Sequence, residues 1–494
     1  MKRSFPRIIT GTGLLLLAST ASAATAASAT LPDTAVGRLA GTLVRHVASD
    51  DPAQIRHWAP DILAASVAAD DKTDFIAGLV SAVRDEGGVD VFDVRTDPHQ
   101  PGFLEVAVKG HRDGQAALFG LAADPAHPDR FAQAMMVPMD DPLYADWPKG
   151  PVSHAQFRKL IHTALERLVG TYDFSGCVSV FDGGETVFDE CRGLADRGFN
   201  VPVGHQTKFH VGSIGKMFTA VAIAQLVEAG KLSWNDTLAK WVPEYPDQAM
   251  AKKITVWELL HHTAGLGDFM VPDYFEHSAR YVNPMDYLGL IARQPKVGEP
   301  GKDLSYSNAG YVLLGRIIEN VSGENYFDYI QHHVFEPAQM TSSGFDSLDE
   351  IVPGLAVGYY HDDGVFSRTW KANWVHSVYK GSPAGGGYST NADLLRFARA
   401  LHGSKLLKPA TLAKMFDGEL PAGPGAIGAG IDERLSHGRH IRGHQGGIEG
   451  TTADLEMVWE TGAAVVLTSN EGPSQHWLLA EQITDLLAAE STRP

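Results

Sequence analysis

The segment 211–218 places a serine and a lysine at a spacing that suits nucleophilic catalysis. Ser213 is followed by Lys216 and by apolar residues at helical spacing, so Ser213 is expected at a helix N-terminus with Lys216 one turn later on the same face. The helix dipole favours negative charge on the serine oxygen, and a desolvated lysine amine can take the hydroxyl proton. The pair predicts a nucleophile and its base, although Ser-x-x-Lys also arises by chance in a chain of this length.

Two later segments carry polar side chains that a cleft could use. Tyr306 and Asn308 stand in a loop before an apolar helical stretch. Both side chains can project into one cleft, or Asn308 can simply cap the next helix. Near the C-terminus, His444 precedes Gly446 and Gly447 and leads to apolar strands. The glycines would let a ligand lie against the backbone, and His444 can donate a hydrogen bond or a proton.

In this order the motifs resemble the active-site triplet of the class C β-lactamase and penicillin-binding-protein superfamily, more specifically of its β-lactamase-related serine hydrolases and esterases. The motifs are Ser213-x-x-Lys216, Tyr306-x-Asn308 and His444-x-Gly446. Segments 259–266 and 383–390 agree with the resemblance, which covers about residues 155–490. It implies an α+β fold of β-lactamase-like type, in which an antiparallel sheet is flanked by helices and joined by an all-helical lobe.

The resemblance also implies a role for each residue. Ser213 attacks a carbonyl and becomes acylated. Lys216 and Tyr306 share the proton transfers, and Tyr306 is favoured as the activator of the deacylating water. Asn308 orients the substrate amide or ester. The oxyanion hole is expected to consist of the backbone N–H groups of Ser213 and Gly447.

The third motif departs from the pattern of most true β-lactamases. His444 and Gly446 are expected to bind substrate, but His444 stands where lysine is usual and Gln445 where threonine or serine is common. This departure weakens recognition of a β-lactam carboxylate and favours a peptidase, amidase or esterase. The sequence has neither a class-A-type glutamate motif nor a Gly-x-Ser-x-Gly elbow around Ser213, so a glutamate-activated water and an α/β-hydrolase are not supported.

The sequence therefore predicts an exported serine hydrolase that cleaves an ester or amide, in a small molecule or a peptide, through a covalent acyl-serine intermediate. A D-amino-acid-directed peptidase or a weak β-lactamase is a second prediction. A third is a sensing or binding protein whose serine is acylated without turnover. The intact Lys216 and Tyr306 argue for turnover.

Apolar periodicity indicates how the chain positions these motifs. Residues 32–138 are predicted to be a small α+β accessory domain, with helices at 34–47 and 75–83 and strands at 104–108, 116–122 and 131–137. By element order and size alone, this domain resembles the ketosteroid-isomerase-like cone fold. A proline-rich stretch at 139–152 is the expected linker.

Residues 153–490 are predicted to form the β-lactamase-like domain. It opens with a helix at 157–168 and a hairpin of strands 177–181 and 186–191, and it closes with strands at 454–459 and 463–469 and a helix at 477–489. Strands at both ends with helices between them predict an antiparallel sheet assembled from distant parts of the chain. A segment rich in tyrosine, phenylalanine and histidine, at 271–283, either borders the site or forms an exposed loop.

Cys177 and Cys191 are the chain's two cysteines and lie nearly symmetrically about the hairpin turn. Facing each other across two strands, they would reach disulfide distance, and exported chains meet oxidising conditions. The alternative is a pair of buried free thiols, because a register change of one residue would separate them.

The first 23 residues are predicted to be a cleavable signal peptide. Basic residues precede a short apolar run, and Ala21-Ser22-Ala23 supplies the small residues of a cleavage site. The expected location is therefore the periplasm or the secreted fraction. No later run reaches the ~18 apolar residues of a membrane span, so stable membrane insertion is not expected after processing.

The composition limits the classes of molecule that this protein is expected to bind. The chain has 494 residues, 44% of them hydrophobic, with 41 Lys+Arg against 59 Asp+Glu and a formal net charge of −18. This composition indicates a folded protein and disfavours nucleic acid as a partner. His437, His440 and His444 are spaced closely enough for a metal site, but His444 already has a role. No metal and no cofactor are predicted.

Overall fold

The computed structural model describes residues 30–489, apart from 68, 97–101, 113, 140–143, 145, 173, 362–366, 368, 376, 418, 419, 423, 424, 473 and 475. The predicted signal peptide at 1–23 and part of the predicted linker at 139–152 lie outside the described residues.

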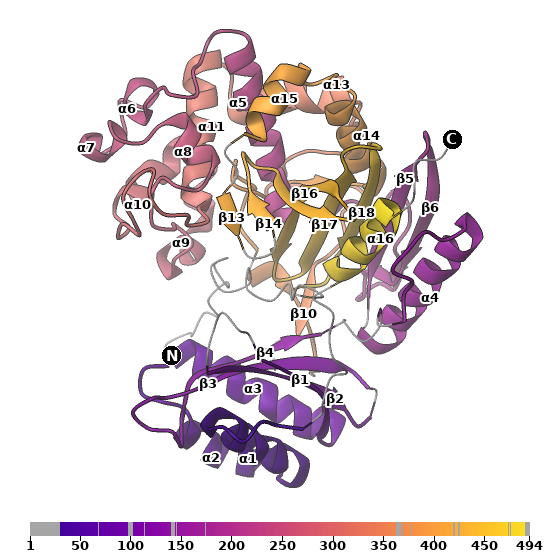
Figure 1. Cartoon of the computed structure of the whole chain (residues 1–494). Coiled ribbons are helices and arrows are strands. Elements are labelled where there is room, and N and C mark those ends of the chain that lie inside the picture. Colours follow the sequence, from indigo (N-terminus) through magenta and orange to yellow (C-terminus); the bar gives the residue numbers. More distant parts are fainter. Residues whose placement is uncertain are drawn as a thin grey trace.

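The N-terminal part packs helices on one face of an antiparallel sheet (Figure 1). The helices are α1 (Ala35–Ser49), α2 (Pro52–Trp58), the 3-10 helix η2 (Ala59–Ile62) and α3 (Ala69–Glu86). The strands, adjacent in chain order, are β1 (Val89–Thr96), β2 (Phe103–Gly110), β3 (Ala116–Ala123) and β4 (Phe131–Pro138). Buried side chains of both layers, such as Leu43, Phe75 and Phe119, form a separate core. The likeness to a cone fold stays a prediction.

Strand β1 is the strand of this sheet that the sequence analysis did not predict, because its residues do not alternate regularly. Its pairing with β2 shifts register between Val91 and Asp93. Such a bulge puts consecutive apolar residues out of the two-residue period, so β1 does not read as a half-buried strand.

A second antiparallel sheet carries the C-terminal part, with the strand order β13-β14-β15-β16-β17-β18-β5-β6. Two of its strands come from the start of the C-terminal part, β5 (Gly176–Asp182) and β6 (Glu185–Arg192). The other six come from near the chain's end: β13 (Leu420–Ala422), β14 (Gly425–Ile427), β15 (Asp432–Ser436), β16 (Arg439–Ile448), β17 (Thr451–Val458) and β18 (Ala463–Ser469). Because β5 pairs with β18, the sheet joins distant parts of the chain, as predicted.

Helices cover both faces of this sheet. On one face, α4 (His154–Tyr172) and α16 (Trp477–Ala489) share a core with β5 and β18. On the other face, α5 (Gly215–Glu228) and α14 (Asn391–His402) belong to a larger core that includes inward side chains of β17 and β18. Figure 1 shows α16 in front of this sheet and the helical lobe beside it.

The helical lobe is built from short elements around α5 and α11 (Asn308–Ser322). They are α6 (Leu238–Trp241), α7 (Gln248–Ala251), α8 (Val256–Leu260), α9 (Pro272–Glu276), η5 (Ser278–Arg280), η6 (Pro284–Tyr287), α10 (Leu288–Ala292), α12 (Tyr326–Ile330), the π-helix η7 (Gln331–Phe335), α13 (Glu336–Ala338) and α15 (Pro409–Met415). Small elements complete this part: β7 (Leu194–Asp196), β8 (Val201–Pro202), β9 (Phe209–His210), η4 (Gly212–Ile214), β10 (Tyr359–His361), β11 (Trp370–Ala372), η8 (Asn373–Val375) and β12 (Tyr388–Ser389).

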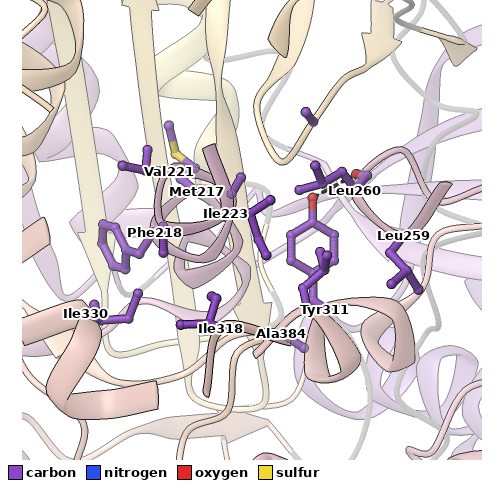
Figure 2. Close-up of a cluster of buried hydrophobic side chains, with 14 of the residues drawn as sticks. Met217, Phe218, Val221, Ile223, Leu259, Leu260, Tyr311, Ile318, Ile330 and Ala384 are labelled. Carbon is purple, nitrogen blue, oxygen red and sulfur yellow. Dashed lines mark hydrogen bonds between the residues drawn. The ribbon is translucent and has the colours of Figure 1, made fainter. Parts of the chain in front are cut away.

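Helix α5 is buried on all sides rather than on one apolar face. Its residues from Gly215 to Ala224 are all buried, and Figure 2 shows Phe218 and Ile223 among side chains of α8, α11 and α12. A helix that is apolar all round belongs in the middle of a core. This position gives Lys216, on its first turn, an apolar environment.

The β5–β6 hairpin places the cysteines opposite each other. Its two turn residues, Gly183 and Gly184, both have positive φ, at 58° and 93°, as tight hairpin turns require. The register pairs Cys177 with Cys191, and a disulfide joins them.

Candidate active site

Ser213 lies in the tight turn η4, between β9 and α5. Gly212 in this turn has a φ of 51°. Gly446 of β16 packs against one side of the turn, because a Cβ at Gly446 would lie 2.0 Å from the Val211 carbonyl oxygen and 3.0 Å from Ser213 N. On the other side, the Gly386 N–H donates to the Gly212 carbonyl oxygen over 2.9 Å. Backbone without side chains therefore encloses the serine.

The amine of Lys216 is fully buried beside this serine. Its Nζ lies 3.1 Å from Ser213 Oγ and 2.8 Å from Asn308 Oδ1, and it also contacts the Ala384 carbonyl oxygen. A neutral amine has two N–H donors and one lone pair. Because Asn308 Oδ1 and the Ala384 oxygen can only accept, they take both donors. The lone pair is then left for the hydroxyl proton of Ser213.

The surroundings of Lys216 favour this neutral form. Burial lowers the pKa of Lys216 to about 7, while the carboxylates of Asp268 and Asp432 oppose the shift. A group whose pKa lies near the working pH suits general base catalysis. The arrangement can therefore take a proton from Ser213 at neutral pH.

Tyr306 contacts the same serine. Its ring centroid lies 4.7 Å from Lys216 Nζ. Burial raises the pKa of Tyr306 well above its usual value and the nearby Ser213 opposes only part of this shift, so the phenol keeps its proton. The ring stacks on His262 with 4.5 Å between centroids. His262 Nδ1 accepts the Ser307 N–H over 2.8 Å, and burial keeps the pKa of His262 well below its usual range. A neutral imidazole therefore supports the Tyr306 ring.

Asn308 is the first residue of α11, and Ser307 caps that helix by accepting the Gly310 N–H over 3.0 Å. The alternative prediction that Asn308 is the cap is therefore wrong. Asn308 Nδ2 donates to Asp268 Oδ2 over 2.9 Å. Asp268 thus fixes the orientation of the amide and turns its oxygen toward Lys216.

The two N–H groups of the predicted oxyanion hole come from neighbouring backbone. Gly447 N lies 2.8 Å from the position that a Cβ on Gly212 would take. The N–H groups of Ser213 and Gly447 therefore belong to segments in close contact, η4 and β16. Paired backbone donors of this kind can bind the oxygen of a tetrahedral intermediate.

His444 lies beside this group with its side chain 5% exposed, and its ring centroid is 6.3 Å from that of Tyr306. Its Nδ1 lies 2.5 Å from the Gln445 carbonyl oxygen. Burial lowers the pKa of His444 to about 3, so the ring is neutral and its one N–H is already donated to the backbone. His444 therefore presents an acceptor to the site and not the proton donor expected from the sequence.

Several residues of the site were not singled out by sequence reasoning. Asp268 follows the segment 259–266 closely, so the family pattern offered a signal for it, and His262 lies within that segment. Asp432 comes from β15, a strand that the sequence pattern did not predict. The Ala384 carbonyl could not be found from side-chain types, because its role depends on where the backbone passes.

The described residues include no group of three or more His, Cys, Asp or Glu side chains arranged to hold a metal. His440 instead pairs with Glu460, with 2.6 Å between Nδ1 and Oε1. In the same part of the chain, no helix is long and apolar enough to cross a membrane. The segment 271–283 buries Tyr274 in an aromatic cluster with Phe269 and Tyr287.

Comparison with known proteins extends this picture from the site to the domain. The family model described as Beta-lactamase matches residues 157–488. The chain belongs to the Beta-lactamase family. Members of this family are serine hydrolases, including penicillin-binding proteins and amidases.

A penicillin-binding protein of Bacillus subtilis (strain 168) is 32% identical over 276 residues, which is 52% of this chain and 59% of that protein. This chain therefore covers less than two thirds of that relative's length. Among solved structures, a penicillin-binding protein from Bacillus halodurans is 28% identical with a TM-score of 0.58, over 66% of this chain and 98% of the other. A D-amino acid amidase from Ochrobactrum anthropi SV3, complexed with L-phenylalanine amide, is 26% identical with a TM-score of 0.56, over 68% and 97%.

Proposed function

We propose that this protein is an exported serine hydrolase that cleaves an ester or amide through a covalent acyl-serine intermediate, without a metal or cofactor. The observation that carries the proposal is the contact between Lys216 Nζ and Ser213 Oγ at 3.1 Å. Because burial lowers the pKa of that amine to about 7, it can accept the serine proton when a carbonyl carbon is attacked.

Acylation would use both partners of the serine. Lys216 takes the proton of Ser213 as Oγ bonds to the carbonyl carbon, and the carbonyl oxygen becomes an oxyanion held by the N–H groups of Ser213 and Gly447. Tyr306, which keeps its proton in the free enzyme, gives that proton to the leaving group as the bond to it breaks. The acyl-serine then coexists with a lysine ammonium and a tyrosine phenolate, and the ammonium lies 4.7 Å from the phenol ring centroid.

Deacylation would reverse these transfers. The Tyr306 phenolate takes a proton from water as the water oxygen attacks the acyl carbon. When the tetrahedral intermediate collapses, the serine oxygen leaves and takes the proton of Lys216. Both groups return to their starting states, so the cycle balances and supports turnover rather than a stable adduct.

A D-amino-acid-directed amidase or peptidase is the second candidate. The observation that favours it is the likeness to the D-amino acid amidase, at 26% identity over 97% of that chain. A weak β-lactamase is less favoured, because the neutral His444 offers no positive charge to a β-lactam carboxylate.

The test is replacement of the nucleophile, Ser213→Ala. We expect loss of p-nitrophenyl ester hydrolysis and of labelling by a fluorophosphonate, whereas Ser233→Ala, at an exposed serine, should behave as the wild type. Unchanged turnover, or labelling of another residue, would refute the proposal. A burst followed by a stable adduct would instead identify a sensing or binding protein.

The same assay separates the candidate substrates. Esters, D-amino-acid amides and β-lactams are compared by kcat/KM, each corrected by the Ser213→Ala control. A D-amino-acid amide that exceeds its L-isomer would establish the second candidate.

A further inference from the structure

We propose that Asp432 and His444 form a subsite that binds a cationic amine of the substrate and rejects a carboxylate. The proposal rests on the proposed function and adds a substrate class to it. The subsite has two acceptor atoms, Asp432 Oδ2 and His444 Nε2, which lie 4.0 Å apart.

His444 Nε2 is an acceptor because of what the other ring nitrogen does. The Gln445 carbonyl oxygen can only accept, so the Nδ1 that lies 2.5 Å from it must carry the proton of the neutral ring. Nε2 is then a bare lone pair. It is buried, and no hydrogen-bond partner for it exists among the described residues. Buried polar atoms normally have a hydrogen-bond partner, so this lone pair is available to a donor group.

Asp432 brings a negative charge to this nitrogen. The register of β15 and β16 pairs Asp432 with Gly443, the residue before His444. Its side chain remains 41% exposed, so a substrate group can reach the carboxylate. Its pKa is raised to about 7, so the carboxylate is ionised in mildly alkaline solution.

The two atoms together require a donor. Neither the lone pair nor the ionised carboxylate can donate to the other, but an ammonium has several N–H groups and can bind both at ordinary hydrogen-bond distances. A carboxylate placed there would meet two acceptors and a like charge, which is strongly unfavourable.

No free positive charge on the same strand offsets this preference. Arg442, two residues before His444 on β16, is engaged by Glu433 with 2.6 Å between Nη2 and Oε2. Lys216 is the cation that faces Asp432, and its pKa of about 7 leaves it largely neutral in mildly alkaline solution. Asp268 adds a second carboxylate near Lys216.

The experiment compares matched esters at about pH 8, where Asp432 is ionised and a benzylic amine is protonated. Leaving groups are varied as 3-(aminomethyl)phenyl, 3-methylphenyl and 3-carboxyphenyl acetates. A second series varies the acyl group as p-nitrophenyl esters with an amine, a methyl group or a carboxylate at the chain end. Each kcat/KM is divided by the rate of alkaline hydrolysis, so that intrinsic reactivity cancels.

In one of the two series, we expect the corrected kcat/KM of the amine substrate to exceed that of its methyl analogue by about tenfold or more, as a charged hydrogen bond allows. The corrected kcat/KM of the carboxylate substrate should be lower than both. Asp432→Asn should bring the ratio of kcat/KM between the amine ester and the methyl ester close to one, whatever its effect on the turnover of the methyl ester itself. Glu185→Gln, which removes a charge at the exposed tip of the β5–β6 hairpin, should retain the preference.

The outcomes separate this inference from the proposed function. If hydrolysis requires Ser213 but neither series favours the amine, the subsite is refuted and the hydrolase stands. An equal loss for all three esters in Asp432→Asn would show a structural role for Asp432 and also refute the subsite. If hydrolysis survives in Ser213→Ala, the proposed function itself fails.

Discussion

Among the residues of the site, Lys216 owes its chemistry to its neighbours rather than to its own type. A lysine in water is protonated at neutral pH. Here, burial in the core favours the neutral amine, and the carboxylates of Asp268 and Asp432 limit that shift. Asn308 Oδ1 and the Ala384 carbonyl oxygen orient the amine. The same set of contacts thus sets both the proton affinity and the direction of the lone pair.

This balance predicts the pH dependence of hydrolysis. Below pH 7 the amine becomes protonated and cannot accept the serine proton, so kcat/KM should fall as the pH drops through about 7. Tyr306 stays protonated throughout this range because its pKa is raised. Lys216→Arg, which is charged at every such pH, should lower kcat by at least about 10².

A control separates Lys216 from Asp432, whose pKa is also about 7. Asp432 raises the pKa of Lys216, so Asp432→Asn should move the acidic limb of the profile to lower pH without removing it. A flat wild-type profile from pH 6 to 8, or a limb that vanishes in Asp432→Asn, would contradict the assignment of Lys216 as the base.

Among the elements, the contact of β16 with η4 determines where the oxyanion donors lie. A Cβ on Gly446 would lie 2.0 Å from the Val211 carbonyl oxygen, so Gly446→Ala must push η4 and β16 apart. Loss of one oxyanion donor costs about 10²–10³ in kcat, and we expect Gly446→Ala to lower kcat by a factor in this range while circular dichroism stays unchanged.

Gly204→Ala is the matched control, because a Cβ there would meet no heavy atom within 4 Å. Its kcat should equal that of the wild type. If Gly446→Ala retained kcat within about threefold, the close approach of the two segments would not matter for catalysis.

The elements also show what the sequence could predict. Strands β17 and β18 and helix α16 lie close to their predicted ranges, since the alternation of β17, the apolar run of β18 and the helical spacing of apolar residues in α16 are visible locally. Strand β15 was missed, because its residues Asp432 to Ser436 are mostly polar and its pairing with β16 depends on the whole sheet.

The residues of the site likewise divide into those that the sequence could predict and those that it could not. Ser213, Lys216, Tyr306 and Asn308 could be proposed from spacing and family likeness, and the structure brings them together. Asp432 could not be proposed, because a carboxylate on a polar strand looks like any exposed residue until the fold places it beside His444.

In the whole molecule, the N-terminal and C-terminal sheets each have their own buried core. Strand β5, from the start of the C-terminal part, pairs with β18 from its end. The hairpin partner of β5, strand β6, lies at the edge of that sheet. The disulfide between Cys177 and Cys191 ties this edge strand to its neighbour, so it protects a position where a sheet would otherwise open.

The disulfide also provides a test of the proposed export to the periplasm or the medium. Disulfides persist in oxidising compartments and are rare in the cytosol. Full-length protein made in a bacterial host should be recovered outside the cytosol with Ala24 as its first residue, and its denatured form should not react with maleimide until it is reduced. Residues 24–494 made in the cytosol and alkylated at lysis should label at both cysteines.

Reduction of the disulfide should lower the free energy of unfolding by about 3 kcal/mol, the size expected for a loop of this length. The same treatment should not change the free energy of unfolding of a Cys177→Ser/Cys191→Ser variant. Retention of residues 1–23 would refute cleavage, and labelling of the unreduced exported protein would refute the bridge, so each half of the prediction stands or falls on its own measurement.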